Sequence, residues 1–285
     1  MFGKRYIKLG LLVFICLITT YPKLCLAGGN TENYTQGAAQ MGMGYTNATQ
    51  TDVFSAFNNQ AGLAHLQTWS VGVFTESRYL LNELSYFGAS AALPTKQGAF
   101  GLSVGYFGSP IYNENKIGLA YGRMLGERFS IGTQLQYLGV AIEEYGSKGA
   151  LTFELGMQFN VTNDFTLAAH VFNPVRIELS EYQNEQFPTV FKLGFGWKPS
   201  DKLTINAETE KDIDYDVVFK AGIEYKIIDA LALRAGVGTA PTLGAFGVGI
   251  YLKENFQIDV AAAYHQQLGF TPGISFIYKG KSESK

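Results

Sequence analysis

The feature that most limits the possible folds of this chain is a one-by-one alternation of apolar and polar residues, repeated in segments about ten residues long. The clearest segment is 149–161, where Phe153 and Leu155 fall on one face and Glu154 and Gly156 fall on the other. A period of two residues is that of a β-strand. Beyond the first 27 residues, no apolar run reaches the roughly 20 residues that a membrane-spanning helix needs. The chain is therefore expected to be an all-β protein.

The same alternation along the whole chain predicts fourteen strands. The expected ranges are 68–77, 83–93, 98–107, 116–124, 129–140, 149–161, 165–172, 188–198, 203–210, 217–227, 231–238, 243–252, 256–264 and 272–279. Proline lacks the N–H group that a strand ladder needs, so its positions test this assignment. Pro188 and Pro272 open expected strands, and the other prolines after the first 27 residues fall in the expected connections.

The expected connections alternate in length. At one end of the strands they are tight turns of three or four residues, and at the other end they run from four residues to the fifteen of 173–187. This difference, together with an even number of antiparallel strands, is typical of bacterial outer-membrane proteins. We therefore predict a 14-stranded antiparallel transmembrane β-barrel at 68–279, in contact with outer-membrane lipid, with both termini in the periplasm and 280–285 as a polar tail. A soluble β-sandwich is the alternative fold.

The first 27 residues have the pattern of a secretory signal peptide. Basic residues precede an apolar stretch at 9–20, and small residues around position 27 fit a cleavage site. Cys16 and Cys25, the two cysteines of the chain, both lie in this segment. The mature chain is thus expected to lack disulfides, thiolate metal sites and cysteine nucleophiles. Lipidation of Cys25 is the less favoured alternative.

The overall composition excludes two classes of protein. The chain has 22 Lys and Arg against 24 Asp and Glu, so it has no basic excess for binding nucleic acid. Its hydrophobic share of 47% with only 16% charged residues is not that of a disordered chain. We expect no nucleic-acid partner.

Residues 28–67 precede the first expected strand, and we call this segment the hatch. Its glycine-rich stretch at 37–44 can pass close to a barrel wall, because glycine has no side chain to keep the backbone away. The stretch at 52–57 predicts a short helix with an apolar face that needs a partner. We expect the hatch to fold into the lumen and close it. A disordered leader is the alternative.

Two stretches of the hatch carry a family resemblance. The sequences at 37–44 and 52–64 resemble the N-terminal signature of the PorV/PorQ-type outer-membrane proteins, which are relatives of the FadL-like (OmpP1/FadL/TodX) barrel superfamily. Gln60 stands where those proteins usually carry proline. Further similar stretches extend over the mature chain, at 172–174, 211–215, 233–236 and 264–269.

The resemblance implies a fourteen-stranded outer-membrane barrel whose N-terminal segment is folded in as a hatch. Candidate hatch residues within the two stretches are Gly42, Gly44, Phe54, Phe57, Asn58 and Gly62.

Members of this family import hydrophobic molecules or serve the type IX secretion system. Because the expected loops of this chain are short, the favoured expectation is a secretion-associated or other envelope accessory barrel that docks on a larger complex and is not an open porin. An uptake channel for hydrophobic small molecules and a structural barrel without transport are the alternatives.

Charged residues on the polar face of the expected strands point into the barrel. Both signs occur on strands that are close in order, which indicates an ion-pair network filling a narrow lumen, whereas an ion-selective pore would show one dominant sign. The candidate residues are Glu154, Lys192, Glu208, Lys220, Glu224, Arg234 and Asp259.

No enzymatic activity and no cofactor are expected. Residues 101–105 match the nucleophile-elbow pattern, but they lie inside an expected strand, whereas an elbow needs a strand-to-helix turn. Asp212, Asp214 and Asp216 alternate in an expected extracellular loop and are a weak candidate for binding Ca²⁺. Because the glycine and the distal glutamate of an EF-hand loop are missing, a solvated turn is favoured over a metal site.

Overall fold

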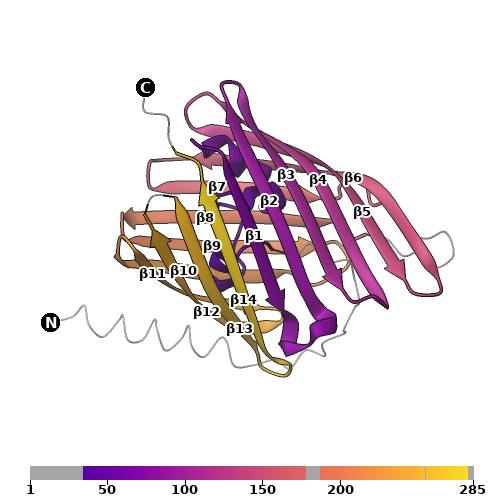
Figure 1. Cartoon of the computed structure of the whole chain (residues 1–285). Helices are drawn as coiled ribbons and strands as arrows, with labels where there is room; N and C mark the ends of the chain where they lie inside the picture. Colours follow the sequence, from indigo (N-terminus) through magenta and orange to yellow (C-terminus); the bar gives the residue numbers. More distant parts are fainter. Residues whose placement is uncertain (1–34, 178–186, 254, 282–285) are drawn as a thin grey trace.

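The strands close into a single barrel (Figure 1) in the computed structural model, which describes residues 35–177, 187–253 and 255–281. Each strand pairs antiparallel with its neighbours in chain order, and the last strand returns to pair with the first. The predicted 14-stranded antiparallel barrel is confirmed, and closure excludes the alternative β-sandwich. The expected signal peptide lies outside the described residues.

All the expected strands are present, with ends that shift by up to four residues. They are β1 (Ser70–Ser77), β2 (Ser85–Thr95), β3 (Gly98–Gly108), β4 (Tyr112–Leu125), β5 (Phe129–Ile142), β6 (Gly146–Asn160), β7 (Phe165–Phe172), β8 (Val190–Ser200), β9 (Leu203–Asp212), β10 (Val218–Ile228), β11 (Leu231–Thr239), β12 (Thr242–Leu252), β13 (Phe256–His265) and β14 (Gly269–Lys279).

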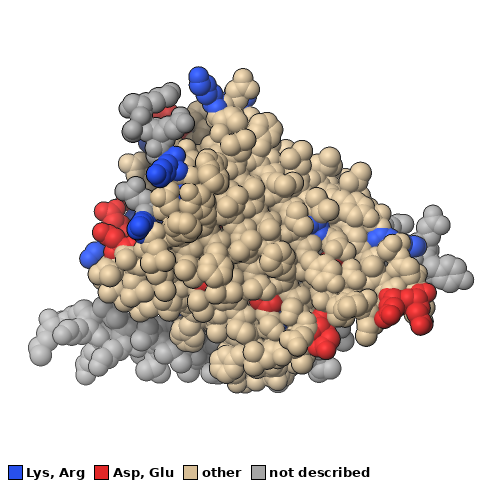
Figure 2. All heavy atoms as spheres, in the orientation of Figure 1, with Lys and Arg blue, Asp and Glu red and all other residues tan. Residues whose placement is uncertain are grey.

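The two faces of the barrel wall differ in character. On β6, Leu155 and Met157 are 47% and 49% exposed, whereas Glu154 and Gln158 on the opposite face are buried. Figure 2 shows one side of the molecule, where the middle is nearly free of charge and the charged side chains gather toward the ends. An apolar outer face with polar residues inside is the pattern of a barrel surrounded by lipid.

Aromatic pairs mark the end of the barrel that holds the C-terminus and the short turns. The rings of Trp69 and Tyr278 lie 5.3 Å apart, and those of Phe165 and Trp197 stack at 5.6 Å. Trp and Tyr favour the interface between hydrocarbon and headgroups, where their apolar rings and polar groups are both satisfied. These pairs are therefore placed as an aromatic girdle would be.

Short helices interrupt the segments outside the barrel wall. They are α2 (Ala38–Gly42), α3 (Ser55–Asn58), η1 (Gln60–His65), η2 (Arg78–Leu80) and η3 (Asn82–Leu84). The helix expected at 52–57 begins only at Ser55, because the Asp52 carboxylate accepts the Phe54 N–H at 2.8 Å and closes a turn before it. Within the described ranges, none of these helices has the length and apolar character needed to cross a membrane.

The expected difference in connection length is wrong for several loops. The connections 78–84 and 173–189 are long, but 109–111, 143–145 and 266–268 hold three residues each. At these points the strands continue in register to the turn, as in the pairing of β4 with β5 up to Tyr112. Most of the added strand ends, such as 112–115 and 146–148, are polar or glycine-rich, so no apolar alternation marks them in the sequence.

Prolines occur within three strands, contrary to the expectation. Pro94 and Pro199 lie near the ends of β2 and β8, and Pro272 lies inside β14. Pro272 pairs with Ala262 of β13, whereas the pairing of β14 with β1 begins only at Gly273. At the level of Pro272, β14 has a single partner strand, and a proline is tolerated there as on an edge.

Candidate functional site

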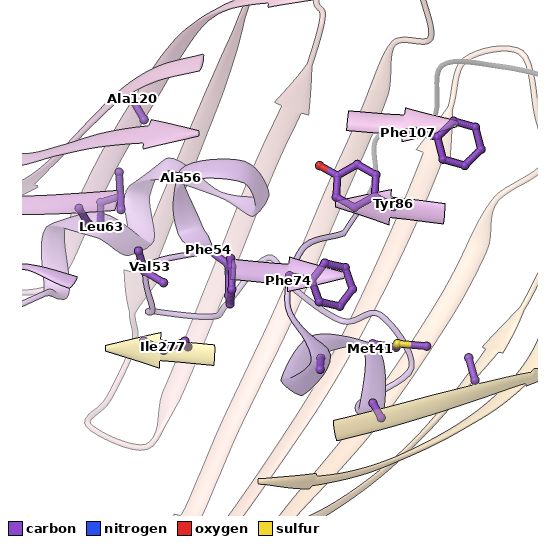
Figure 3. Close-up of a cluster of buried hydrophobic side chains, with 14 of the residues drawn as sticks. Met41, Val53, Phe54, Ala56, Leu63, Phe74, Tyr86, Phe107, Ala120 and Ile277 are labelled. Carbon is purple, nitrogen blue, oxygen red and sulfur yellow. The ribbon is translucent and has the colours of Figure 1, made fainter. Parts of the chain in front are cut away.

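Hatch residues 35–67 lie inside the barrel, where α2 packs against β11–β14 and η1 against β3–β6. Figure 3 shows the apolar core that results, with Met41 and Phe54 of the hatch lying beside Phe74 and Ile277 of the wall. The Phe54 and Phe74 rings meet edge to face at 6.4 Å. Removal of these side chains from water stabilises the position of the hatch.

Glycines allow the hatch backbone to touch the wall. A Cβ atom at Gly222 would overlap the backbone of Met43, and one at Gly236 would overlap Gly44. Gly44 has a φ of +70°, in the left-handed region that favours glycine. A Cβ atom at Gly42 would lie 2.9 Å from the Gly247 backbone of β12. Larger residues at these positions would push the hatch and the wall apart.

Other candidate hatch residues fold the segment onto itself. The Asn58 side chain accepts the Gln36 N–H at 3.0 Å and donates to the Gln36 carbonyl at 2.9 Å. Gly62 leaves room for the Gln50 carbonyl and the Ser55 side chain. These contacts hold the early part of the hatch, around Gln36 and Gln50, against its later part, around Asn58 and Gly62.

A buried charge cluster joins the wall to the hatch, and we call it the Glu154 cluster. The Glu154 carboxylate meets Lys116 Nζ at 2.8 Å and His170 Nε2 at 2.9 Å. It also accepts a hydrogen bond from Gln60 Nε2 of the hatch at 2.6 Å. Lys116 Nζ lies 5.8 Å from the centre of the Phe57 ring, which is also in the hatch. Displacement of the hatch would therefore expose a buried carboxylate and leave it short of partners.

A second cluster holds the other side of the hatch and consists of Lys192, Glu208, Glu210 and Lys220. One oxygen of Glu208 accepts the backbone N–H groups of Asn47 and Ala48, both at 2.8 Å. Lys220 Nζ lies 2.7 Å from Glu210 and 3.9 Å from Glu208. Two main-chain donors on one carboxylate fix this turn of the hatch against β9.

The third cluster surrounds Arg234. Its guanidinium contacts Glu224 at 2.6 Å and Asp259 at 2.7 Å. Asp259 also accepts the Ser275 hydroxyl at 3.2 Å, and Ser275 Oγ accepts the Ala38 N–H of the hatch at 3.3 Å. The candidate lumen charges thus lie on the inner wall in three clusters, and each cluster has a link to the hatch.

The sequence reasoning missed Lys116 and the hatch contacts of all three clusters. Lys116 stands at the edge of an expected strand, where the residues before it are polar and give no alternation to fix its face. Contacts between the hatch and the barrel wall also produce no repeating pattern in the sequence. The inward-facing glycines of several expected strands, among them Gly156, Gly194, Gly222 and Gly236, indicated room for the hatch beside the wall.

A small aromatic cavity lies near the end of the lumen opposite the short turns. It has a volume of about 30 Å³. Lys116 lies at its edge, with Nζ 4.8 Å from the centre of the Phe172 ring. The side chains that give the cavity its apolar character are Tyr86, Phe107, Leu138, Phe172 and Phe187.

Asn173 holds one wall of this cavity in place. Its Nδ2 donates to the carbonyls of Phe187 and Pro188 at 3.0 Å and 3.3 Å. Its Oδ1 accepts the Thr152 hydroxyl at 2.7 Å, and its carbonyl accepts the Thr189 hydroxyl at 2.7 Å. Asn173 therefore helps to position Phe187, whose N–H also donates to the Ile177 carbonyl at 3.1 Å, a role that its sequence context did not indicate.

Among the ionisable groups of the hatch, Asp52 and Tyr45 have raised pKa values. Burial raises the pKa of the Asp52 carboxyl, against the lowering effect of hydrogen bonds from Gln40 and the Phe54 N–H. Burial also raises the pKa of the Tyr45 hydroxyl well above its ordinary value, and the Glu76 carboxylate adds to this shift. Tyr45 therefore stays protonated and donates to Glu76 at 3.4 Å.

The candidate calcium loop does not gather its carboxylates. Within the described part of the chain, no group of three or more His, Cys, Asp or Glu side chains is placed to hold a metal. Asp214 pairs with Arg176 at 3.2 Å, and Asp212 accepts the Asp214 N–H at 3.1 Å. Asp212 is also the last residue of β9 and not part of a loop.

The 101–105 motif lies inside β3. Ser103 is fully buried, and its hydroxyl donates to Gln134 Oε1 at 3.2 Å. It has neither the exposure nor the strand-to-helix turn of a nucleophile elbow.

Sequence comparison finds no match, either among protein-family models or among curated proteins. Solved structures do match. The toluene transporter TbuX of Ralstonia pickettii aligns with a TM-score of 0.68 at 12% identity, over 86% of this chain and 98% of that one. The Pseudomonas putida toluene transporter TodX aligns with a TM-score of 0.68 at 11% identity, over 87% and 99%. A FadL homologue of Pseudomonas aeruginosa gives 0.63 at 13% identity, over 86% and 98%.

The chain has the fold of a FadL-like barrel. The FadL-like part of the resemblance seen in the sequence is thus supported. The finer PorV/PorQ type has no support from these structures, which are two toluene transporters and a FadL homologue.

Proposed function

We propose that this protein is an outer-membrane barrel that binds small apolar molecules at its outer mouth and lets them pass when the hatch shifts. The observation that carries this proposal is the aromatic cavity beside Phe172 and Phe187, which lies directly above the junction of hatch and wall at Lys116. Apolar walls with one charged group at the edge are typical of sites for small hydrophobic ligands. The fold shared with toluene transporters supports the same function.

The packing of the hatch argues against a permanently open pore. Phe54, Phe57 and Leu63 are fully buried between hatch and wall, and three charge clusters hold the hatch. Passage of a molecule through the lumen therefore requires the hatch to move. The cavity of about 30 Å³ must also enlarge before it can admit a ligand larger than a few atoms. The accessory role expected first from the sequence has no such feature in its favour.

Filling the cavity tests the proposal. Leu138→Trp places a large ring in the cavity, whereas Leu135→Trp changes the outer face of the same strand, where Leu135 is 59% exposed. Cells that express the protein should take up labelled toluene or hexane faster than cells without it. Leu138→Trp should reduce this gain at least severalfold, and Leu135→Trp should leave it unchanged. Equal uptake by all cells would instead favour an accessory or structural barrel.

We also propose that the short turns and both termini face the periplasm. The cysteines of the chain lie in the expected signal peptide, so an introduced cysteine has no competing thiol in the mature protein. A cysteine at Ile111 should react with an impermeant maleimide on intact cells, and one at Ser200 should react only after lysis. The reverse labelling pattern would show that the barrel has the opposite orientation in the membrane.

A further inference from the structure

An apolar groove lies on the outside of the barrel, across β1–β4 near the end with the short turns. Its volume is about 320 Å³. The short side chain of Ala91 forms its floor, between the longer outward side chains of Val71 and Leu102. Leu93 and Phe100 line its end nearer the short turns. The groove has the shape and polarity to hold a hydrocarbon chain lying along the wall.

The outward side chains change in character from the groove toward the rim, which is the end of the barrel with the short turns. Next to the apolar floor comes a row of aromatic residues, in which Trp69 packs on Tyr278 and Phe100 packs on Tyr121 at 5.1 Å. Rings of this kind mark the level at which hydrocarbon gives way to headgroups. The groove therefore ends at the membrane interface.

Basic side chains follow at the rim. Lys96 lies in the turn that joins β2 to β3, three residues beyond Leu93. Arg123 is exposed on β4, two residues beyond Tyr121, so it stands about 7 Å closer to the rim. No ion pair within the described residues involves Lys96 or Arg123, and Glu127 is the acidic residue in the adjacent turn. Figure 2 shows basic side chains at the upper end of this face.

We propose that this face binds one anionic phospholipid, with an acyl chain in the Ala91 groove and its phosphate between Lys96 and Arg123. The order from floor to rim is apolar, aromatic and basic, which matches the order of acyl chain, interface and phosphate in a lipid. Basic residues at a membrane surface attract anionic headgroups. This inference rests on the proposed outer-membrane location, and it is separate from the cavity and the hatch.

Retention of phosphatidylglycerol by the purified protein in detergent micelles tests the proposal. Native mass spectrometry should show one retained lipid per barrel. Loss of both charges in Lys96→Gln with Arg123→Gln should lower the affinity roughly 25-fold, since each basic group near an anionic lipid contributes about a factor of five. Ala91→Trp, which fills the floor, should abolish retention.

Matched controls separate a specific site from general effects. Lys202→Gln removes a basic residue from another short turn at the same end, and Ala221→Trp adds the same ring to the outer face of β10. Both should retain the lipid as the wild type does. Heat-dependent mobility on a gel confirms that every variant is a folded barrel.

Two results would overturn the lipid site. Equal retention by the charge variant and the Lys202 control would show that Lys96 and Arg123 do not bind the phosphate. A dimer that Ala91→Trp dissociates would show that this face is a contact between copies of the chain. The proposed location is tested separately. If the protein fails to insert into phosphatidylglycerol-containing vesicles, that location is wrong, whatever the micelle experiment shows.

Discussion

Two parts of the lumen are filled in different ways. Around Gly222 and Gly236 the hatch backbone lies directly on the wall, with no space for a side chain between them. Around Phe172 and Phe187 side chains meet side chains, and a cavity remains. Backbone packed against backbone cannot yield without moving a whole segment, whereas rings can change rotamer. The proposed ligand route therefore lies on the aromatic side, while the glycine side anchors the hatch.

The Glu154 cluster joins the hatch to the wall on the aromatic side, and its loss should have the largest effect. Glu154→Gln removes the negative charge that faces Lys116 and His170, so the partly buried Lys116 ammonium loses its carboxylate partner. Breaking a buried ion pair in this way costs about 3 to 5 kcal/mol. Unfolding in urea from lipid vesicles measures the loss. Glu143→Gln, in an exposed turn, should change stability little, and equal effects would mean that the cluster does not hold the hatch.

A side chain on the glycine side should have the next largest effect. Gly236→Val forces a Cβ into the backbone of Gly44, and overpacking of this kind costs about 1 to 3 kcal/mol. Gly244→Val is the matched control, because nothing lies within 4 Å of a Cβ built there. Protease digestion from the periplasmic side should also cut the hatch faster in Gly236→Val. Identical stability and digestion of the two variants would contradict the tight contact.

Loosening the aromatic side should have the smallest effect on stability. Thr152→Val removes one hydrogen bond to Asn173, which costs about 1 kcal/mol. Because Asn173 also holds Phe187, we expect faster hydrocarbon uptake despite this small loss. Thr209→Val, on another strand, is the control. Slower uptake by Thr152→Val would show that the ordered position of Phe187 is needed for transport and does not limit it.

The sequence predicted the wall of the barrel better than its contents. Residues such as Leu155 and Glu154 lie on opposite faces because a strand alternates its side chains, and this period is visible in the sequence. The polar strand end at 112–115 showed no such period, so the connection before it was expected to be longer. Asn173 and Lys116 act through residues distant in the chain, and single-sequence patterns do not record such contacts.

Conductance across a planar lipid bilayer tests most directly whether the hatch closes the lumen. The intact protein should be nearly silent, because buried side chains and three charge clusters hold residues 35–67 in the barrel. A variant that lacks residues 28–66 should conduct steadily through the emptied lumen. Large, steady currents from the intact protein would contradict the account and would make it an open porin.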